Sequence, residues 1–307
     1  MERVMKDKKA IALFLLPALI LFTLIIIVPL FMSLYYSVLD WNGIGERVFV
    51  GFSNYSELLA DTSRFLPAVR NTFIFAAASL FIQLPFSLFL ALVLASRVKG
   101  ERFFVTVYFI PVVLSAVVIG QLWLRIYYPR GGLLNTLLTA LGWMDPTQPK
   151  AWLGDISSVL PAVMVPILWQ YVGYHMLLYY SGIKSISPDI YEAARIDGAG
   201  FWQTAFRITI PLLKPILQVS VTFCVVGSMK VFDLVKVMLS DGGPAGAGEV
   251  ITTLMVRRMF YPSNRYGYGS AMAIILIFLC VVLYQAVGIV FRERDGGKER
   301  KRGRLRG

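Results

Sequence analysis

The sequence predicts an all-α integral membrane protein with six transmembrane helices and a cytoplasmic helix-Gly-helix hairpin between helices 4 and 5. Composition is the first reason. Of 307 residues, 57% are hydrophobic and only 16% are charged, whereas soluble globular chains carry about 25% charged residues. The second reason is the spacing of long apolar windows, and the third is the turn chemistry of one loop between two of those windows.

Apolar windows define the expected spans. A helix needs about 20 mostly apolar residues to cross a bilayer, and five windows satisfy this: residues 10–36, 71–95, 103–124, 211–232 and 270–291. The first window follows Lys6, Lys8 and Lys9 as a signal peptide would, but it is too long and predicts a retained anchor. A sixth and weaker window, 159–182, is the fourth in chain order. It contains prolines and polar residues, which favours a helix that faces a protein-lined interior.

The distribution of Lys and Arg gives the expected orientation. With the N-terminus inside, inner segments hold 19 basic residues and outer segments hold 11, which places both termini in the cytoplasm. Residues 1–9 are then a cytoplasmic N-terminus and 292–307 a basic cytoplasmic tail, with eight basic and three acidic residues. Beside apolar spans, this charge is better explained by anionic membrane lipid than by nucleic acid. A specific lipid or regulatory role of the tail stays an alternative to a solvated anchor.

Several classes of chemistry lack the residues they need. The chain has two cysteines, Cys224 and Cys280, and one histidine, His175, too few for a metal cluster or a disulfide framework. No partner motif supports a catalytic triad, and there is no G-x-x-x-x-G-K-[ST] phosphate loop. We expect no catalytic residue, no metal site and no cofactor in this chain, so any ATP must be bound elsewhere.

Residues 183–210 form the informative loop, which we expect to face the cytoplasm. A Ser cap, a first-turn Pro and a first-turn Asp indicate a helix start at Ser187, Pro188 and Asp189. Gly198 marks its end, and Phe201–Ile208 forms a second helical stretch before the next span. One helix face is narrow enough for a partner backbone to approach, with Ile190, Ala193, Ala194 and Asp197 at i, i+3, i+4 and i+7. An amphipathic helix on the membrane surface without any partner is the alternative.

Within this loop, Glu192-Ala193-Ala194 is followed after three residues by Gly198, and after nine more by Ile208-x-Ile210-Pro211. This resembles the EAA loop, E-A-A-x3-G-x9-I-x-L-P, of permease subunits of binding-protein-dependent ABC importers. The one departure, Ile210 for Leu, keeps volume and hydrophobicity. The resemblance covers nearly the whole chain and is nearest to the sugar-type permeases, which include maltose, lactose and glycerol-phosphate importers. Supporting stretches include Phe109-Ile110-Pro111, Phe232-Asp233 and Gly242-Gly243-Pro244.

The resemblance implies both partners and site residues. In that family the loop seats in a cleft of the ATPase subunit, so the implied coupling positions are Glu192, Ala193, Ala194, Gly198 and Pro211, with Asp197 and Ala199 beside them. It implies two ATPase subunits that hold ATP and Mg, a second permease that is most often a different chain, and an extracytoplasmic solute-binding protein. The location implied is the cytoplasmic membrane of a bacterium or archaeon.

The fourth span is the candidate substrate pathway. It concentrates aromatic and hydrogen-bonding side chains that suit sugars, Trp169, Gln170, Tyr174 and His175. Ordinary contact between helices explains these groups equally well. Lys230 and Asp233 lie at i, i+3 near the end of the fifth span, where a mutual ion pair or snorkelling accounts for them without a substrate.

Two other classes of function compete with import driven by partner ATPases. A secondary, ion-coupled transporter needs coupling-ion ligands or a proton relay within the membrane, but the spans hold few acidic groups. A membrane-embedded enzyme is disfavoured by the single histidine and the lack of paired carboxylates. The sequence therefore favours ATP-driven solute import by alternating access, in which this chain conducts and couples.

Overall fold

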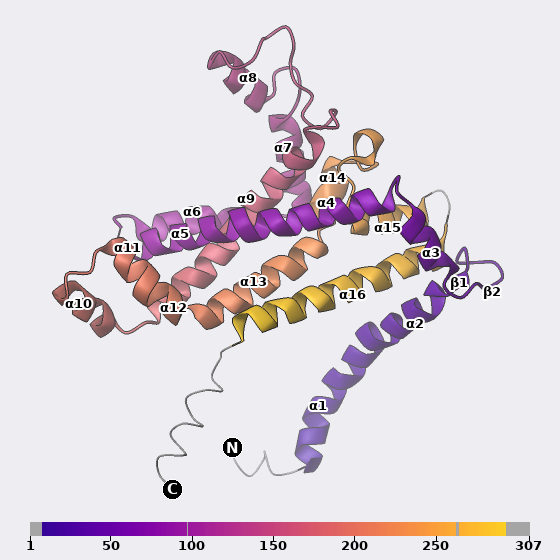
Figure 1. Ribbon diagram of the computed structural model, residues 1–307, viewed down its shortest axis with the longest axis horizontal. Helices are drawn as coiled ribbons and strands as arrows, with labels where there is room; N and C mark the ends of the chain where they lie inside the picture. The colour runs from indigo at the N-terminus through magenta and orange to yellow at the C-terminus, as the bar shows by residue number, and fades with distance from the viewer. Residues whose placement is uncertain (1–7, 97, 262–263, 293–307) are drawn as a thin grey trace. The chain divides into compact units, whose positions relative to one another are not determined.

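The computed structural model describes residues 8–96, 98–261 and 264–292 and is mostly helical, as predicted (Figure 1). The residues numbered 1–7 and 293–307 lie outside this description, and with them most of the predicted cytoplasmic N-terminus and basic tail. The α-helices are α1 (Lys8–Phe22), α2 (Val28–Ser37), α3 (Ser53–Ala60), α4 (Phe65–Ala78), α5 (Leu84–Ala95), α6 (Glu101–Val113), α7 (Ala116–Ile126), α8 (Leu133–Ala140), α9 (Val159–Lys184), α10 (Pro188–Ile196), α11 (Phe201–Thr204), α12 (Ile210–Leu212), α13 (Lys214–Met229), α14 (Asp233–Met238), α15 (Ile251–Phe260) and α16 (Tyr266–Phe291).

Short irregular elements join these helices. Three are π-helical turns and one is a 3-10 turn: η2 (Thr23–Ile27), η3 (Ser79–Gln83), η4 (Ala205–Thr209) and η5 (Pro244–Gly246). Within the described residues, the β-structure is one antiparallel pair, β1 (Leu39–Asp40) and β2 (Val48–Phe49), with Leu39 opposite Phe49.

Three continuous helical stretches are long and apolar enough to cross a bilayer: Leu13–Ser37, Phe65–Ala95 and Tyr266–Phe291. They overlap the predicted windows 10–36, 71–95 and 270–291. Two further candidates are bent pairs of helices, so the described residues offer up to five spans by length and composition. The prediction of several membrane-spanning helices is confirmed at this coarser level.

The predicted span 103–124 is not one straight helix. α6 and α7 meet at an angle of 99°, because Leu114 and Ser115 have extended backbones with ψ of 142° and 149°. The Ser115 hydroxyl accepts a hydrogen bond from the Val118 amide and so caps α7. A window average of hydrophobicity does not register such a break, since the flanking residues are all apolar.

The predicted span 211–232 also contains a bend, which lies near its start. Its upstream stretch, Phe201–Leu212, meets Lys214–Met238 at 76°. Pro215 stands at the start of α13, where its ring excludes a preceding helical turn and its nitrogen donates no hydrogen bond. The apolar window therefore contains the end of one helix and the whole of the next.

α9 occupies the predicted fourth span, 159–182, as a continuous helix of 26 residues, yet it is not among the candidate spans. Polar side chains such as Gln170 and His175 lower its hydropathy. α9 packs on α5, α6 and α13, so neighbouring helices rather than lipid cover much of it. Gly173 permits the closest of these contacts, because a Cβ there would overlap the backbone carbonyl of Tyr108 on α6.

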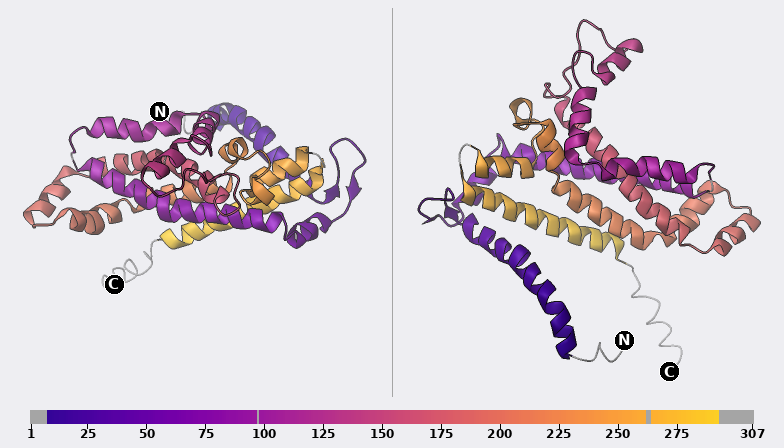
Figure 2. Two further views of the ribbon diagram at one scale, coloured as in Figure 1. Left: turned by 90° about the horizontal axis from the view of Figure 1, so that it is seen from above. Right: turned by 180° about the vertical axis from the view of Figure 1, so that it is seen from behind.

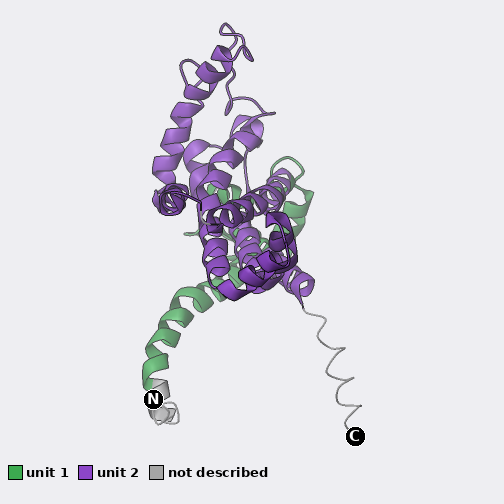
Figure 3. Ribbon diagram, turned by 90° about the vertical axis from the view of Figure 1, so that its left-hand side faces the viewer, with its two compact units in different colours: residues 1–66, 251–278 green, residues 67–250, 279–307 purple. Residues whose placement is uncertain are grey.

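The chain divides into two compact units, residues 67–250 with 279–307 and residues 1–66 with 251–278 (Figure 3). The larger unit has two apolar clusters. One joins α7, α9 and α14 around Ile119, Val163 and Val235, and the other joins α5, α9 and α13 around Ala91 and Met176. In Figures 1 and 2, α10, α11 and α12 lie at one end of this unit, beside the end of α5 and the start of α6.

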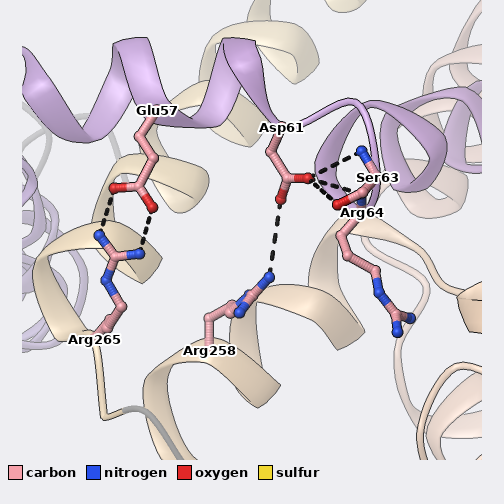
Figure 4. Close-up of polar contacts among 6 residues, drawn as sticks. All are labelled: Glu57, Asp61, Ser63, Arg64, Arg258 and Arg265. Atoms are coloured by element: carbon pink, nitrogen blue, oxygen red, sulfur yellow. Dashed lines mark hydrogen bonds and ion pairs between the residues drawn. The ribbon is translucent and has the colours of Figure 1, made fainter.

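In the smaller unit, ion pairs join α3 to the segment from α15 to α16 (Figure 4). The two terminal guanidinium nitrogens of Arg265, Nη1 and Nη2, each donate to one oxygen of the Glu57 carboxylate at 2.5 Å. Asp61 lies 3.9 Å from Arg258 and also accepts from the Ser63 amide. The hydrogen bonds from Arg265 lower the pKa of Glu57 below its usual 4.5. The pair is therefore ionised over the physiological pH range.

Candidate functional site

Residues 188–212 contain two helical arms separated by Gly198, where the sequence predicts a helix-Gly-helix segment. The Ser187 side chain accepts from the Asp189 amide, and Pro188 is the first residue of α10. Gly198 has φ of +76°, which confirms the left-handed conformation expected of a glycine that ends a helix. The second arm is longer than predicted, since α11, η4 and α12 run without interruption from Phe201 to Leu212.

The four residues of the α10 face that was predicted to be accessible differ in solvent exposure. Ala194 is only 5% exposed and packs inward, while Ile190, Ala193 and Asp197 are exposed. Gly198 and Pro211 are also exposed, and Ala199 is half-buried. Of these motif positions, Ala194 alone is buried and so contributes little to the outer surface.

A hollow of about 360 Å³ lies between this hairpin and the ends of α5 and α9. We call it the hairpin hollow. Of the motif residues, Glu192 and Ala199 line it, and Lys184 and Arg195 contribute positive charge. The hollow combines these charges with apolar walls and with Tyr191 from α10.

Glu192 of the motif lies on the surface of α10. Across the described ranges, its carboxylate has no hydrogen-bond or ion-pair partner and is exposed. Apolar packing holds the hairpin instead, with Ala194 and Ala205 buried. Trp202 also stacks on Phe89 of α5, with ring centroids 6.4 Å apart.

A second cavity, of about 350 Å³, lies among α4, α9, α13 and α14. We call it the central cavity. Three of the four predicted pathway residues, Gln170, Tyr174 and His175, line it. Trp169 is not among its lining residues and instead packs edge-on against Trp123, with ring centroids 6.0 Å apart. The structure therefore places Trp169 in a contact between α7 and α9.

Polar groups in this cavity are positioned by bonds between helices. The Gln170 amide donates to the Leu114 carbonyl at 3.3 Å, at the bend between α6 and α7. The His175 ring shares a hydrogen bond of 2.7 Å with the Ser220 hydroxyl. Ring faces and hydrogen-bonding side chains thus line one space, an arrangement that suits a polyhydroxylated solute.

The sequence singles out Lys230 and Asp233, but it does not place them at this cavity. Lys230 and Asp233 both line it, and no ion pair joins them in the described structure. Lys230 caps the end of α13, Asp233 begins α14, and between them Phe232 has φ of −141°. The helical i, i+3 geometry assumed for the pair does not exist. The signal available in the sequence was two charges at the end of a long apolar window.

Comparison with known proteins agrees with these features. The family model described as "Binding-protein-dependent transport system inner membrane component" matches residues 83–295. The chain is 39% identical over 274 residues to the probable ABC transporter permease protein YurN of Bacillus subtilis (strain 168), which covers 88% of this chain and 92% of that protein. It is 31% identical over 293 residues to the diacetylchitobiose uptake system permease protein NgcF of Streptomyces coelicolor, with 91% and 81% covered.

A solved structure shows the same fold. A chain of a bacterial alginate ABC transporter, crystallised with an alginate pentasaccharide-bound periplasmic protein, superposes with a TM-score of 0.79 at 24% identity. The match covers 92% of this chain and 93% of that one. Proteins of this family are membrane permease subunits and are not themselves enzymes. The chain belongs to the family of binding-protein-dependent transport system inner membrane components, the multi-pass permease subunits of ABC importers.

Proposed function

We propose that this permease translocates a sugar or sugar-like solute by alternating access, driven by ATP that partner subunits hydrolyse. The central cavity supports the solute class, because Tyr171 and Tyr174 offer ring faces beside the amide of Gln170 and the charges of Lys230 and Asp233. Relatives named for diacetylchitobiose uptake and for alginate import point the same way.

The proposed topology has six spans with both termini in the cytoplasm. α9 is the fourth span in chain order, and its packing on α5, α6 and α13 explains how a helix with polar residues can cross the bilayer. The excess of Lys and Arg on the proposed inner side supports the orientation. Segment 183–210 then faces the cytoplasm, and the loop from α7 to α9 faces outward.

The hairpin is proposed to couple this chain to an ATPase subunit through Glu192, Ala193, Ala194, Asp197, Gly198, Ala199 and Pro211. The observation that carries the proposal is the exposed Glu192 carboxylate, which has no partner elsewhere in the described chain. A charge without an internal partner on an ordered helix is free to bind a cation of another subunit. The exposed Ile196 beside it, 86% accessible, adds apolar surface to the same docking region.

The proposed assembly contains two permease chains, two ATPase subunits and an extracytoplasmic solute-binding protein, in the cytoplasmic membrane of a bacterium or archaeon. The second permease is proposed to be a different chain. ATP and Mg²⁺ would be held by the ATPase subunits, since this sequence contains no phosphate loop. Membrane lipid would cover the apolar outer faces of the spans.

Reconstitution tests the proposed function. The permease, its ATPase subunits and the second permease are placed in proteoliposomes with solute-loaded binding protein outside and ATP inside. Solute should accumulate only with hydrolysable ATP, and Glu192→Lys should abolish both uptake and co-purification of the ATPase. Glu46→Gln is the control, because Glu46 is exposed and lies far from the hairpin in sequence. Accumulation driven by an ion gradient without ATP would overturn the proposal.

Cysteine labelling tests the topology. Cys224 and Cys280 are first replaced by Ser, and single cysteines are introduced at Gln148 or Gly198. An impermeant maleimide applied to intact cells should label position 148 and leave position 198 unlabelled until the cells are lysed. Labelling of position 198 in intact cells would contradict a cytoplasmic hairpin.

A further inference from the structure

A polar cluster joins the start of α6 to the end of α9, directly before the hairpin. Glu101, the first residue of α6, binds the Lys184 ammonium at 2.9 Å and also accepts a hydrogen bond from the Tyr180 hydroxyl. The Lys184 ammonium lies 5.3 Å from the centre of the Tyr180 ring. Because Tyr180 and Lys184 are one turn apart, a single carboxylate fixes the last turn of α9.

α6 is also attached to α9 farther along its length. In the middle, Gly173 lets the two backbones meet at Tyr108. At the far end, the Leu114 carbonyl accepts from Gln170, which lines the central cavity. α6 has 13 residues, so it spans about 20 Å and is held at both ends and in the middle.

The near end of this helix pair adjoins the hairpin. Lys184 lines the hairpin hollow together with Glu192 and Arg195. The chain passes from Lys184 through three residues to Pro188, where α10 begins. A displacement of α10 therefore pulls on the turn of α9 that Glu101 holds.

We infer that Glu101 is a positioning residue that locks the root of the hairpin to α6, so that α6 and α9 move as one body between the hairpin and the central cavity. This inference rests on the coupling role proposed above for the hairpin. Because a helix is stiff along its axis, a displacement of α6 at Glu101 also displaces Leu114 at its other end. Leu114 accepts the hydrogen bond of Gln170, which lines the central cavity.

The solvent exposure of the ion pair between Glu101 and Lys184 indicates that its proposed role in coupling can be tested separately from any role in folding stability. The side chains of Lys184 and Glu101 are 39% and 21% exposed, and ion pairs with this access to solvent contribute little to folding. Loss of the pair should leave the chain folded and assembled. Its effect should appear in how tightly ATP hydrolysis is linked to transport.

The experiment measures solute transported per ATP hydrolysed in proteoliposomes that contain the complete transporter and solute-loaded binding protein. Glu101→Gln should lower this ratio at least about fivefold, the lower end of typical coupling between sites, with ATPase co-purification unchanged. Tyr180→Phe should give a smaller decrease in the same direction. The charge swap Glu101→Lys with Lys184→Glu should restore most of the wild-type ratio.

Either of two results would overturn the inference: a wild-type ratio in Glu101→Gln, or a charge swap no better than the single variant. Wild-type proteoliposomes without ATP-dependent uptake would instead refute the proposed function, so the two failures are distinguishable. Glu46→Gln again serves as the control, because it removes one exposed carboxylate outside the α6–α9 pair.

Discussion

Substitution of Gly198 can separate the backbone requirement of the hairpin from its docking role. Gly198 has φ of +76°, and none of the described atoms lies within 4 Å of the position that a Cβ would take. A side chain there meets no obstacle inside the chain. The only internal cost is the left-handed backbone, about 1–2 kcal/mol for an ordinary L-residue and less for Asp or Asn. That cost is small beside typical stabilities of about 5–15 kcal/mol.

Gly198→Asp should therefore insert in the membrane at the wild-type level and fail at docking. The substitution adds a side chain and a negative charge at the exposed position 198, on the surface proposed to meet the ATPase. We expect ATPase affinity to fall about thirtyfold or more, which corresponds to a loss of about 2 kcal/mol at a central interface position. The assays are membrane abundance, co-purification of the ATPase and solute uptake.

Gly142 provides a matched control. It has φ of +74°, follows helix α8 and likewise has no described atom within 4 Å of its Cβ position. Gly142→Asp imposes the same backbone cost on the loop between α7 and α9, far from the hairpin in sequence. It should retain ATPase co-purification. Equal losses in the two variants, or normal uptake and co-purification in Gly198→Asp, would refute the assignment of the hairpin to coupling.

Three further predictions test packing, the central cavity and the smaller unit. Gly173→Ala should reduce thermal stability in detergent by several degrees or more, because the added Cβ overlaps the backbone of α6; an unchanged melting temperature would contradict that close contact. Tyr174→Ala should raise the solute concentration needed for half-maximal transport. Trp169→Phe should leave this concentration unchanged, because Trp169 does not line the central cavity. The opposite pattern would favour Trp169 as the pathway residue. Glu57→Gln should lower stability slightly at pH 7, because the hydrogen bonds from Arg265 hold the pKa of Glu57 below its usual 4.5 and the ionised pair stabilises the folded chain above that value. The difference from wild type should shrink as the pH falls below 4.5 and through the lower folded-state pKa. A pH-independent difference would argue against the ion pair.

Local chemistry made the hairpin predictable. Ser187, Pro188 and Gly198 act on backbone groups within a few residues, so their effect does not depend on the rest of the fold. The structure has the cap, the helix start and the positive φ where the sequence placed them. The family was likewise predictable, because the spacing from Glu192 to Pro211 is a property of the chain order alone.

The composition determined that this is a helical membrane protein, but tertiary packing decided which helices are continuous and what their side chains meet. The bend at Leu114, the break between Lys230 and Asp233, and the position of Trp169 against Trp123 depend on contacts between helices. Apolar residues on either side of a break contribute equally to a hydrophobic window, so the window cannot locate it. The partners of a charged side chain can lie on other helices. The contacts of Glu101 with Tyr180 and Lys184, and the lack of a partner for Glu192 among the described residues, therefore emerged only in three dimensions.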